Sequence, residues 1–390
     1  MNRLLVFSDD WGRHPSSCQH LISQLLPTIE VTWVNTIGMR PPRLDRLTLS
    51  RGAGKLREWA AMHREDTAAE LPTNLTLRSP RMWPWMSHRW DRALNARLLS
   101  RQLHDDAQDA IAITTIPITA DLIGRLPVRR WVYYCVDDFS VWPGLSAAAM
   151  REMEQTLIAG VDRVVAVSDP LAAAIRPRHA HVSVLTHGVD SSFWAHPTCA
   201  PPAAIEHLPT PLAVFWGVVD RRMNADWVLG LADALRDRGA AGTIVLAGPQ
   251  QDPDPRLLTH PRIAAIGPLA FEQLPALAQA ARVLIMPYAD LPVTRAMQPL
   301  KLKEYLATML PVVAADLPAV VPWQDCLKMV DDEASFVAAT LDWMMGNEQT
   351  GDASRDSDPL TQLDRRRQRL ASEDWQSKAE RFGEYVFASA

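Results

Sequence analysis

The chain has 390 residues, a formal net charge of -5 and 22% charged residues. This length exceeds what one hydrophobic core normally holds, and it predicts two domains. The slightly acidic balance gives no reason to expect a nucleic-acid partner. The four cysteines are scattered, without metal-ligand spacing or the density of a disulfide framework, and this pattern is typical of a reducing cytoplasm.

The N-terminus has only the apolar letters LLVF before Ser8 and two aspartates, which is too short for the core of a signal peptide. No apolar run approaches the roughly 20 residues that cross a bilayer as a helix. We therefore expect a cytoplasmic protein that meets a membrane, if at all, at its surface.

Short apolar runs recur at intervals that leave room for a helix between them, which is typical of buried parallel strands. The first series has runs that start at Leu4, Val31, Ile111, Trp131, Arg163 and Val182. A second series starts with LAVFWG at Leu212 and continues through TIVLAG, RIAAIG, RVLIMPY and PVVAAD. Between them, the proline-rich stretch 194–211 has the composition of a linker. We therefore expect an α/β fold of two Rossmann-like domains that face each other across a cleft.

The stretch QPLKLKEYLATMLPVVAAD, residues 298–316, predicts a helix over 299–309 because proline is favoured at a helix start. Lys301 falls in the first turn, where the helix dipole disfavours a cation, and Glu304 lies on the same face. Two interpretations are open. Lys301 and Glu304 form a local ion pair, or a bound anion such as phosphate meets the helix N–H groups and Lys301 together.

Each of the first four strands of the second series is followed by a residue suited to a ligand. Gly217 follows the first strand and Arg221 comes shortly after it, while Gly248, Gly267 and Tyr288 follow the next three strands. A glycine lets a ligand approach the backbone, and an arginine can hold phosphate oxygens in a fork. The alternative is a surface loop with ordinary arginines.

The order of these motifs resembles the nucleotide-sugar domain of GT-B glycosyltransferases: a glycine-and-arginine loop, then GPL, MPY and PLKLKEYLATMLPVVA. The first half continues the resemblance with DDWGRHPSSCQHLISQLL, VSDPLAAAI and THGVDSSFW. It extends over nearly the whole chain and implies an acceptor-binding domain over 1–193, a linker over 194–211 and a nucleotide-sugar domain over 212–365. The final segment, 366–390, then carries the helix that crosses back to the first domain.

The resemblance implies a glycosyltransferase (EC 2.4) that uses a nucleoside-diphosphate sugar, with UDP or GDP expected, and a lipid-linked or polysaccharide acceptor in cell-surface or exopolysaccharide biosynthesis. It implies no catalytic metal and no other cofactor, because GT-B enzymes stabilise the leaving diphosphate with helix ends and basic side chains. A non-catalytic GT-B scaffold subunit and a GT-B-type nucleotide-sugar epimerase are the alternatives.

The resemblance also assigns roles around residue 301. Lys301, with the amides near Pro299 and Leu300, corresponds to the group that contacts the diphosphate, and Glu304 to the acid that hydrogen-bonds the ribose hydroxyls. Many retaining members carry another glutamate seven residues before this one. Here that position is Met297, which departs from the retaining pattern.

Two stretches of the first half supply further candidates. In WGRHPSS, Gly12 and His14 stand where the resemblance places acceptor or diphosphate contacts, although a lone histidine is more often structural. In YYCVDDFSVWPG, Asp137 and Asp138 follow a strand end, and adjacent carboxylates can raise each other's pKa. The stretch is similar to one in the xanthan glucuronosyltransferase, an inverting GT-B enzyme whose base aligns with Asp137. We expect Asp137 to deprotonate the acceptor hydroxyl, and Asp138 to cap the next turn.

Residues 77–101 combine six arginines with a single acid, Asp91, and three tryptophans. Such a segment suits an anionic bilayer surface, and it would favour a lipid-diphosphate-linked acceptor. The alternative is a solvated arginine face with its tryptophans in the core. The candidates that face the membrane are Arg81, Trp83, Trp85, Arg89 and Trp90.

Overall fold

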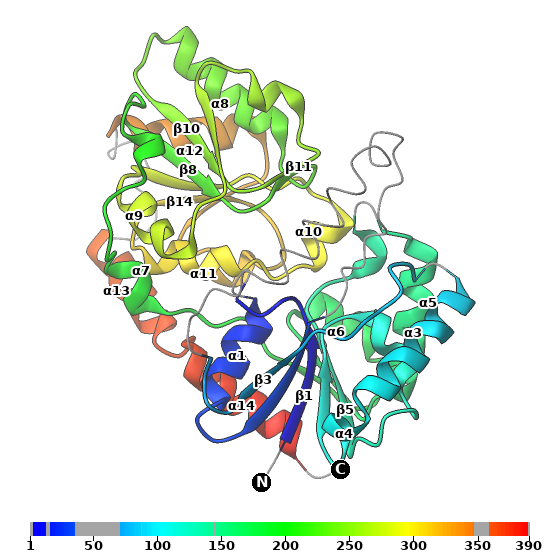
Figure 1. The fold of residues 1–390 in the computed structure, drawn as a ribbon. Helices are drawn as coiled ribbons and strands as arrows, with labels where there is room; N and C mark the ends of the chain where they lie inside the picture. The colour runs from blue at the N-terminus through cyan, green and yellow to red at the C-terminus, as the bar shows by residue number, and fades with distance from the viewer. Residues whose placement is uncertain are drawn as a thin grey trace. The chain divides into compact units, whose positions relative to one another are not determined.

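The computed structural model describes residues 3–12, 16–35, 71–86, 88–142, 145–346 and 359–388. The chain divides into two compact units, in each of which strands alternate with helices (Figure 1). Unit 1 comprises Met1–Ala166, Ile175–Ser183 and Gly383–Ala390. Unit 2 comprises Val167–Ala174 and Val184–Phe382.

Unit 1 is built on a seven-stranded sheet with the order β3-β2-β1-β4-β5-β6-β7, in which β1 pairs in parallel with β2 and β4. Its strands are β1 (Arg3–Ser8), β2 (Glu30–Asn35), β3 (Leu75–Arg78), β4 (Ile111–Thr114), β5 (Arg130–Cys135), β6 (Arg163–Ala166) and β7 (Val182–Val184). Its helices include α1 (Ser17–Leu25), α3 (Arg89–Gln102), α4 (His104–Ala107) and α5 (Ala147–Gly160).

Unit 2 is built on a six-stranded sheet with the order β12-β10-β8-β13-β14-β15, and its strand pairs are parallel. Its strands are β8 (Leu212–Trp216), β10 (Thr243–Ala247), β12 (Ile263–Gly267), β13 (Val283–Met286), β14 (Val312–Ala315) and β15 (Lys328–Val330), with the short pair β9 (Val219–Asp220) and β11 (Gln250–Gln251) beside them. Its helices include α7 (Ser191–Ala195), α8 (Ala225–Asp237), α9 (Leu274–Gln279), α10 (Pro292–Ala296), α11 (Leu300–Ala307), α12 (Glu333–Met345) and α13 (Pro359–Leu370). Helix α6 (Asp169–Ile175) lies almost wholly in this unit.

The parallel α/β architecture predicted from the apolar runs is confirmed. All five residues of β8 and of β10 are buried, as expected for strands covered by helices on both faces. The sequence did not predict β3, β9, β11 or β15, because these strands are two to four residues long and lack a continuous apolar run.

Two segment boundaries differ from the prediction. The expected linker, 194–211, belongs to unit 2, because its apolar side chains Trp194 and Ile205 are buried in that unit's core. The helix expected over 299–309 is shorter, since Pro299 is its N-cap and Leu300 its first residue.

The last helix, α14 (Trp375–Phe387), begins in unit 2 and ends in unit 1, where the Val386 carbonyl accepts a hydrogen bond from Arg130 at 3.0 Å.

Within the described ranges, no helix has both the length and the apolar character needed to cross a membrane.

Candidate functional site

The sheet of unit 2 has one topological switch point, between β8 and β13. From β8 the chain adds β10 and β12 on one side of the sheet, and then β13 on the other side of β8. Ligands of such sheets bind beyond the carboxyl ends of the strands at this point. Gly217 follows β8, Tyr288 follows β13, and the start of α11 comes to the same place, because the Lys301 ammonium contacts the Tyr288 ring.

The backbone of Gly217 and Gly248 forms one side of this site, which we call the glycine floor. Gly217 (φ +127°) donates its N–H to the Ala247 carbonyl at 2.8 Å, and Gly248 (φ +148°) donates to the Gly267 carbonyl at 2.7 Å. A Cβ on Gly248 would lie 2.0 Å from the Gly217 oxygen, and one on Gly217 would lie 2.2 Å from the Lys301 Nζ atom. The backbone angle favours glycine at both positions, and at Gly248 the nearby Gly217 backbone also leaves no space for a side chain.

Lys301 is held over two aromatic rings. Its Nζ atom lies 4.0 Å from the centre of the Phe215 ring and 5.0 Å from that of Tyr288, both within the range of cation–π attraction. Among the described residues Lys301 forms no direct ion pair with Glu304, although the charge of Lys301 lowers the Glu304 pKa. The first N–H groups of α11 lack intrahelical acceptors, and together with the ammonium they form a positively charged corner suited to an anion.

Glu304 is anchored by an indole instead. Its Oε2 atom accepts a hydrogen bond from Trp216 Nε1 at 3.1 Å. The Trp216 ring contacts the Tyr305 ring in a T-shaped arrangement and stacks on Trp194. Burial raises the pKa of Glu304 to about 7, against the lowering effects of the Trp216 hydrogen bond and the charge of Lys301. Glu304 as a whole residue is half-buried, whereas its carboxyl group is desolvated.

The structure does not bring Arg221 to this site. Its guanidinium pairs with Asp252 at 2.7 Å, and both side chains are largely exposed. The neighbouring Arg222 is buried and pairs with Asp220 at 2.8 Å. Since Arg221 already has its own carboxylate partner in the structure, its contacts favour the interpretation as an ordinary arginine of a surface loop over the interpretation as a phosphate ligand.

Position 297 offers no acid to the site. Met297 is 6% exposed and belongs to the hydrophobic core of unit 2. The position seven residues before Glu304 therefore presents a thioether to the core, where a carboxylate would be costly.

The predicted ligand residue Gly267 ends β12 with φ +77° and has open space where a Cβ would be.

The candidates of unit 1 follow β1 and β5. Asp138 caps the 3₁₀ turn Phe139–Val141 by accepting a hydrogen bond from Ser140 N at 3.0 Å, as predicted. Asp137 follows β5 by two residues and is half-buried. Gly12 (φ +79°) is exposed after β1 and donates its N–H to the side chain of Gln19 at 3.2 Å. His14 lies outside the described residues.

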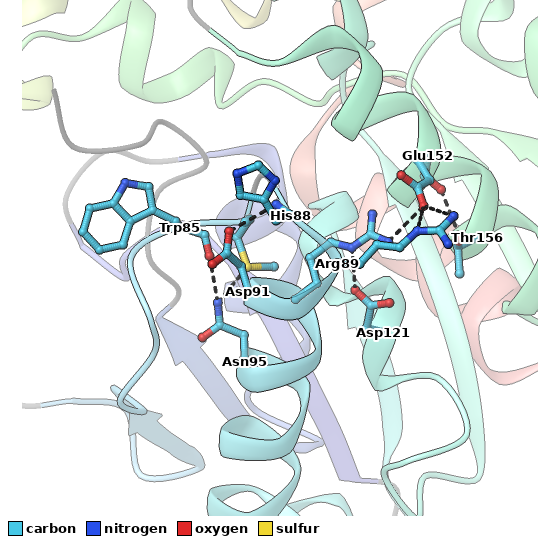
Figure 2. A network of polar contacts seen from close by, with 10 residues as sticks. Trp85, His88, Arg89, Asp91, Asn95, Asp121, Glu152 and Thr156 are labelled. Atoms are coloured by element: carbon cyan, nitrogen blue, oxygen red, sulfur yellow. Dashed lines mark hydrogen bonds and ion pairs between the residues drawn. The ribbon is translucent and has the colours of Figure 1, made fainter.

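Two buried polar side chains of α3 hold the basic and aromatic segment, residues 77–101, in place through hydrogen bonds (Figure 2). Asp91 and Asn95 are each 1% exposed. Asp91 accepts hydrogen bonds from Trp83 Nε1 and His88 N, both at 3.1 Å, and Asn95 donates to the carbonyls of Trp83 and Trp85. These bonds fix the loop that precedes α3.

The alternative that placed these tryptophans in the core is wrong for two of them. Trp83 is 36% and Trp90 is 59% exposed, and their rings contact each other at 5.9 Å between centres. The arginines of the segment are partly neutralised. Arg78 pairs with Asp106. Arg89 pairs with Glu152, and the buried Arg92 pairs with Asp121 and Glu152 (Figure 2). Arg81, Arg97 and Arg101 are exposed.

Over the described ranges, no cluster of three or more histidine, cysteine, aspartate or glutamate side chains could hold a metal ion.

Comparison with known proteins agrees with this geometry. Residues 210–345, which contain the switch-point site, match the family described as Glycosyl transferases group 1. None of the curated protein sequences matches the chain.

Solved structures are similar over the full length. Sucrose-phosphate synthase from Thermosynechococcus elongatus is 14% identical with a TM-score of 0.68, and 98% of each chain is covered. Anabaena HepE in complex with UDP is 15% identical with a TM-score of 0.63, and 100% of each chain is covered. An E. coli structure described as trehalose-6-phosphate bound with UDP-2-fluoro glucose is 14% identical with a TM-score of 0.65, again over 100% of each chain.

These findings define the class of protein: the chain has the GT-B fold. Within this fold, residues 210–345 match the group 1 glycosyltransferase family.

Proposed function

We propose that the protein transfers a sugar from a UDP-sugar to a lipid-linked or saccharide acceptor in polysaccharide assembly. The observation that carries the donor half of this proposal is the convergence of Lys301, the start of α11 and the glycine floor at the switch point of unit 2. A diphosphate fits this corner because it brings negative charge to the ammonium and needs close approach to the backbone. The choice of UDP is supported by the Anabaena and E. coli structures that hold UDP or UDP-sugars.

The proposed reaction needs charge stabilisation on the leaving group and a base for the acceptor. As the bond between the sugar and the diphosphate breaks, negative charge grows on the diphosphate. We propose that the Lys301 ammonium and the N–H groups of Leu300 and Lys301 stabilise this charge without a metal ion. Glu304 would accept hydrogen bonds from the ribose hydroxyls.

Asp137 would take the proton of the acceptor hydroxyl while that oxygen attacks the anomeric carbon. We propose an inverting reaction, because Met297 leaves no carboxylate at the position that many retaining GT-B enzymes use.

The acceptor half of the proposal is supported by the surface around α3. The indoles of Trp83 and Trp90 and the side chain of Leu94 are exposed there, together with Arg89 and Arg97. Aromatic and aliphatic side chains among arginines suit the interface of an anionic bilayer, where a lipid-linked acceptor would be found. Asp91 and Asn95 stabilise this arrangement at the cost of burying polar groups, which favours a role for the exposed tryptophans.

The donor is tested by a thermal-shift panel of UDP, GDP, dTDP and ADP on the wild type. A ligand in hundredfold excess over its Kd stabilises the folded state by about 2.7 kcal/mol. We expect UDP to raise the melting temperature most, and a panel without any shift would refute the proposal. Transfer is then assayed with a labelled UDP-sugar and a bacterial lipid extract.

Membrane binding is tested by flotation with vesicles of phosphatidylcholine alone or mixed with phosphatidylglycerol. We expect binding to the mixed vesicles only, and its loss in the variant Trp90→Ala with Arg97→Glu. Trp90 and Arg97 are chosen because neither takes part in the hydrogen bonds that hold the loop. Equal flotation of the wild type and this variant would contradict the membrane assignment.

A further inference from the structure

Helix α11 also carries a buried lysine that the proposed reaction does not use. Lys303 is 2% exposed, and its ammonium donates hydrogen bonds to Thr186 Oγ1 at 3.1 Å, to the His187 carbonyl and to Glu373 Oε2. Successive residues are 100° apart around an α-helix, so Lys303 lies roughly 160° from Lys301. It therefore fixes the side of α11 that faces away from the donor site.

The bonds of Lys303 use its full donor capacity. An ammonium has three N–H groups, and here they meet three acceptors. Two acceptors lie in the segment that follows β7, and the third, Glu373, lies in the turn between α13 and α14. The Glu373 main chain is in turn bonded to the first segment, because its carbonyl accepts from Val189 N at 2.8 Å. Three attachments to this joined pair of segments leave α11 little freedom to rotate about its axis.

The charges of this cluster do not balance. Lys378, on α14, is 4% exposed and contacts the same two side-chain partners, Glu373 at 2.6 Å and Thr186 at 3.1 Å. Two ammonium groups thus share one carboxylate. Burial lowers the pKa of Lys303 to about 8, so folding disfavours its charged form, even though Glu373 attracts it. A buried cation in excess is costly, and stability alone does not explain it.

We propose that Lys303 is a positioning residue of the donor site: its three attachments set the rotation of α11, which places Lys301 beside Gly217 and Glu304 against Trp216. A displacement of about 1 Å in a binding group is enough to lose much of its contribution. The inference rests on the proposed function, because its readout is the binding of UDP.

The test compares Lys303→Met with Lys378→Met by isothermal titration of UDP. Either substitution leaves one lysine paired with Glu373, so both variants retain the same charge in the cluster. Only Lys303→Met releases α11. We expect the Kd for UDP to rise about tenfold or more in Lys303→Met and to stay within about twofold of the wild type in Lys378→Met. The melting temperatures of the wild type and both variants are measured as well, and they show whether the loss of stability ranks the variants differently from the loss of UDP affinity.

The other outcomes are decisive as well. A wild-type Kd in Lys303→Met, or equal losses in both variants, overturns the positioning role. If Lys303→Met does not fold, Lys303→Gln replaces it, and if neither folds while Lys378→Met does, the role of Lys303 is structural and the inference fails. A wild type that binds no nucleoside diphosphate refutes the proposed function itself, whereas wild-type binding with unaffected variants refutes this inference alone.

Discussion

The variant Gly217→Ala separates backbone strain from loss of the donor site. At φ +127° an alanine is strained, and such positions cost about 1–3 kcal/mol. The new Cβ would also lie 2.2 Å from Lys301 Nζ. A flexible lysine end can move away at little energetic cost, so strain sets the stability loss, and the displaced ammonium sets the loss of UDP binding.

The assay measures both quantities on one protein. We expect the melting temperature of Gly217→Ala to fall by about 3–10 °C and the Kd for UDP to rise about tenfold or more. Gly124→Ala is the matched control, because Gly124 has φ +74° but no atom within 4 Å of its Cβ position. This control should lose less stability than Gly217→Ala, because φ +74° lies close to the left-handed helical region, and it should keep the wild-type Kd. A wild-type Kd in Gly217→Ala would refute the placement of Lys301 in the donor site.

Three further perturbations follow from the structure. Burial raises the pKa of Glu304 from 4.5 to about 7, so the stability that its protonated form contributes is fully present below pH 4.5 and is lost as pH rises through 7. The melting temperature of the wild type should therefore fall relative to that of Glu304→Gln between pH 4.5 and 7. Parallel curves of melting temperature against pH for the two proteins would contradict the buried environment of Glu304. Arg92→Met should lower the free energy of unfolding in urea by about 1–3 kcal/mol, because it leaves Asp121 without its buried partner, whereas the exposed Arg97→Met should change it by less than about 0.5 kcal/mol. Asp137→Asn should keep the UDP Kd and lower the transfer rate by about 10²–10⁴-fold, as expected for loss of a general base; an unchanged rate would exclude Asp137 from that role.

The parallel sheets could be predicted because continuous apolar runs mark strands that are buried on both faces. Local signals also sufficed where cause and effect are adjacent in sequence, as with Pro299 at the start of α11 and Asp138 as a cap. The surroundings of Lys301 and Glu304 could not be predicted from such local signals. The partner of Glu304 is Trp216, which lies 88 residues away on β8, and no spacing rule reveals it.

The same limit explains the residues that sequence reasoning missed. Lys303 was indistinguishable from a surface lysine, because its partners Thr186 and Glu373 lie 117 and 70 residues away. Of two adjacent arginines, the sequence favoured Arg221 as a phosphate ligand, but Asp252, 31 residues further on, pairs with it. Such contacts depend on the tertiary fold.

In the proposed reaction, Lys301 and the start of α11 bind the diphosphate of the donor. The most direct measurement is the Kd for UDP and for uridine in the wild type, in Lys301→Ala and in Lys328→Ala, the last being an exposed lysine on β15. We expect Lys301→Ala to weaken UDP binding by about tenfold or more and to leave uridine binding unchanged. We expect Lys328→Ala to change the affinity for neither ligand. An equal Kd for UDP in the wild type and Lys301→Ala would contradict this role of Lys301.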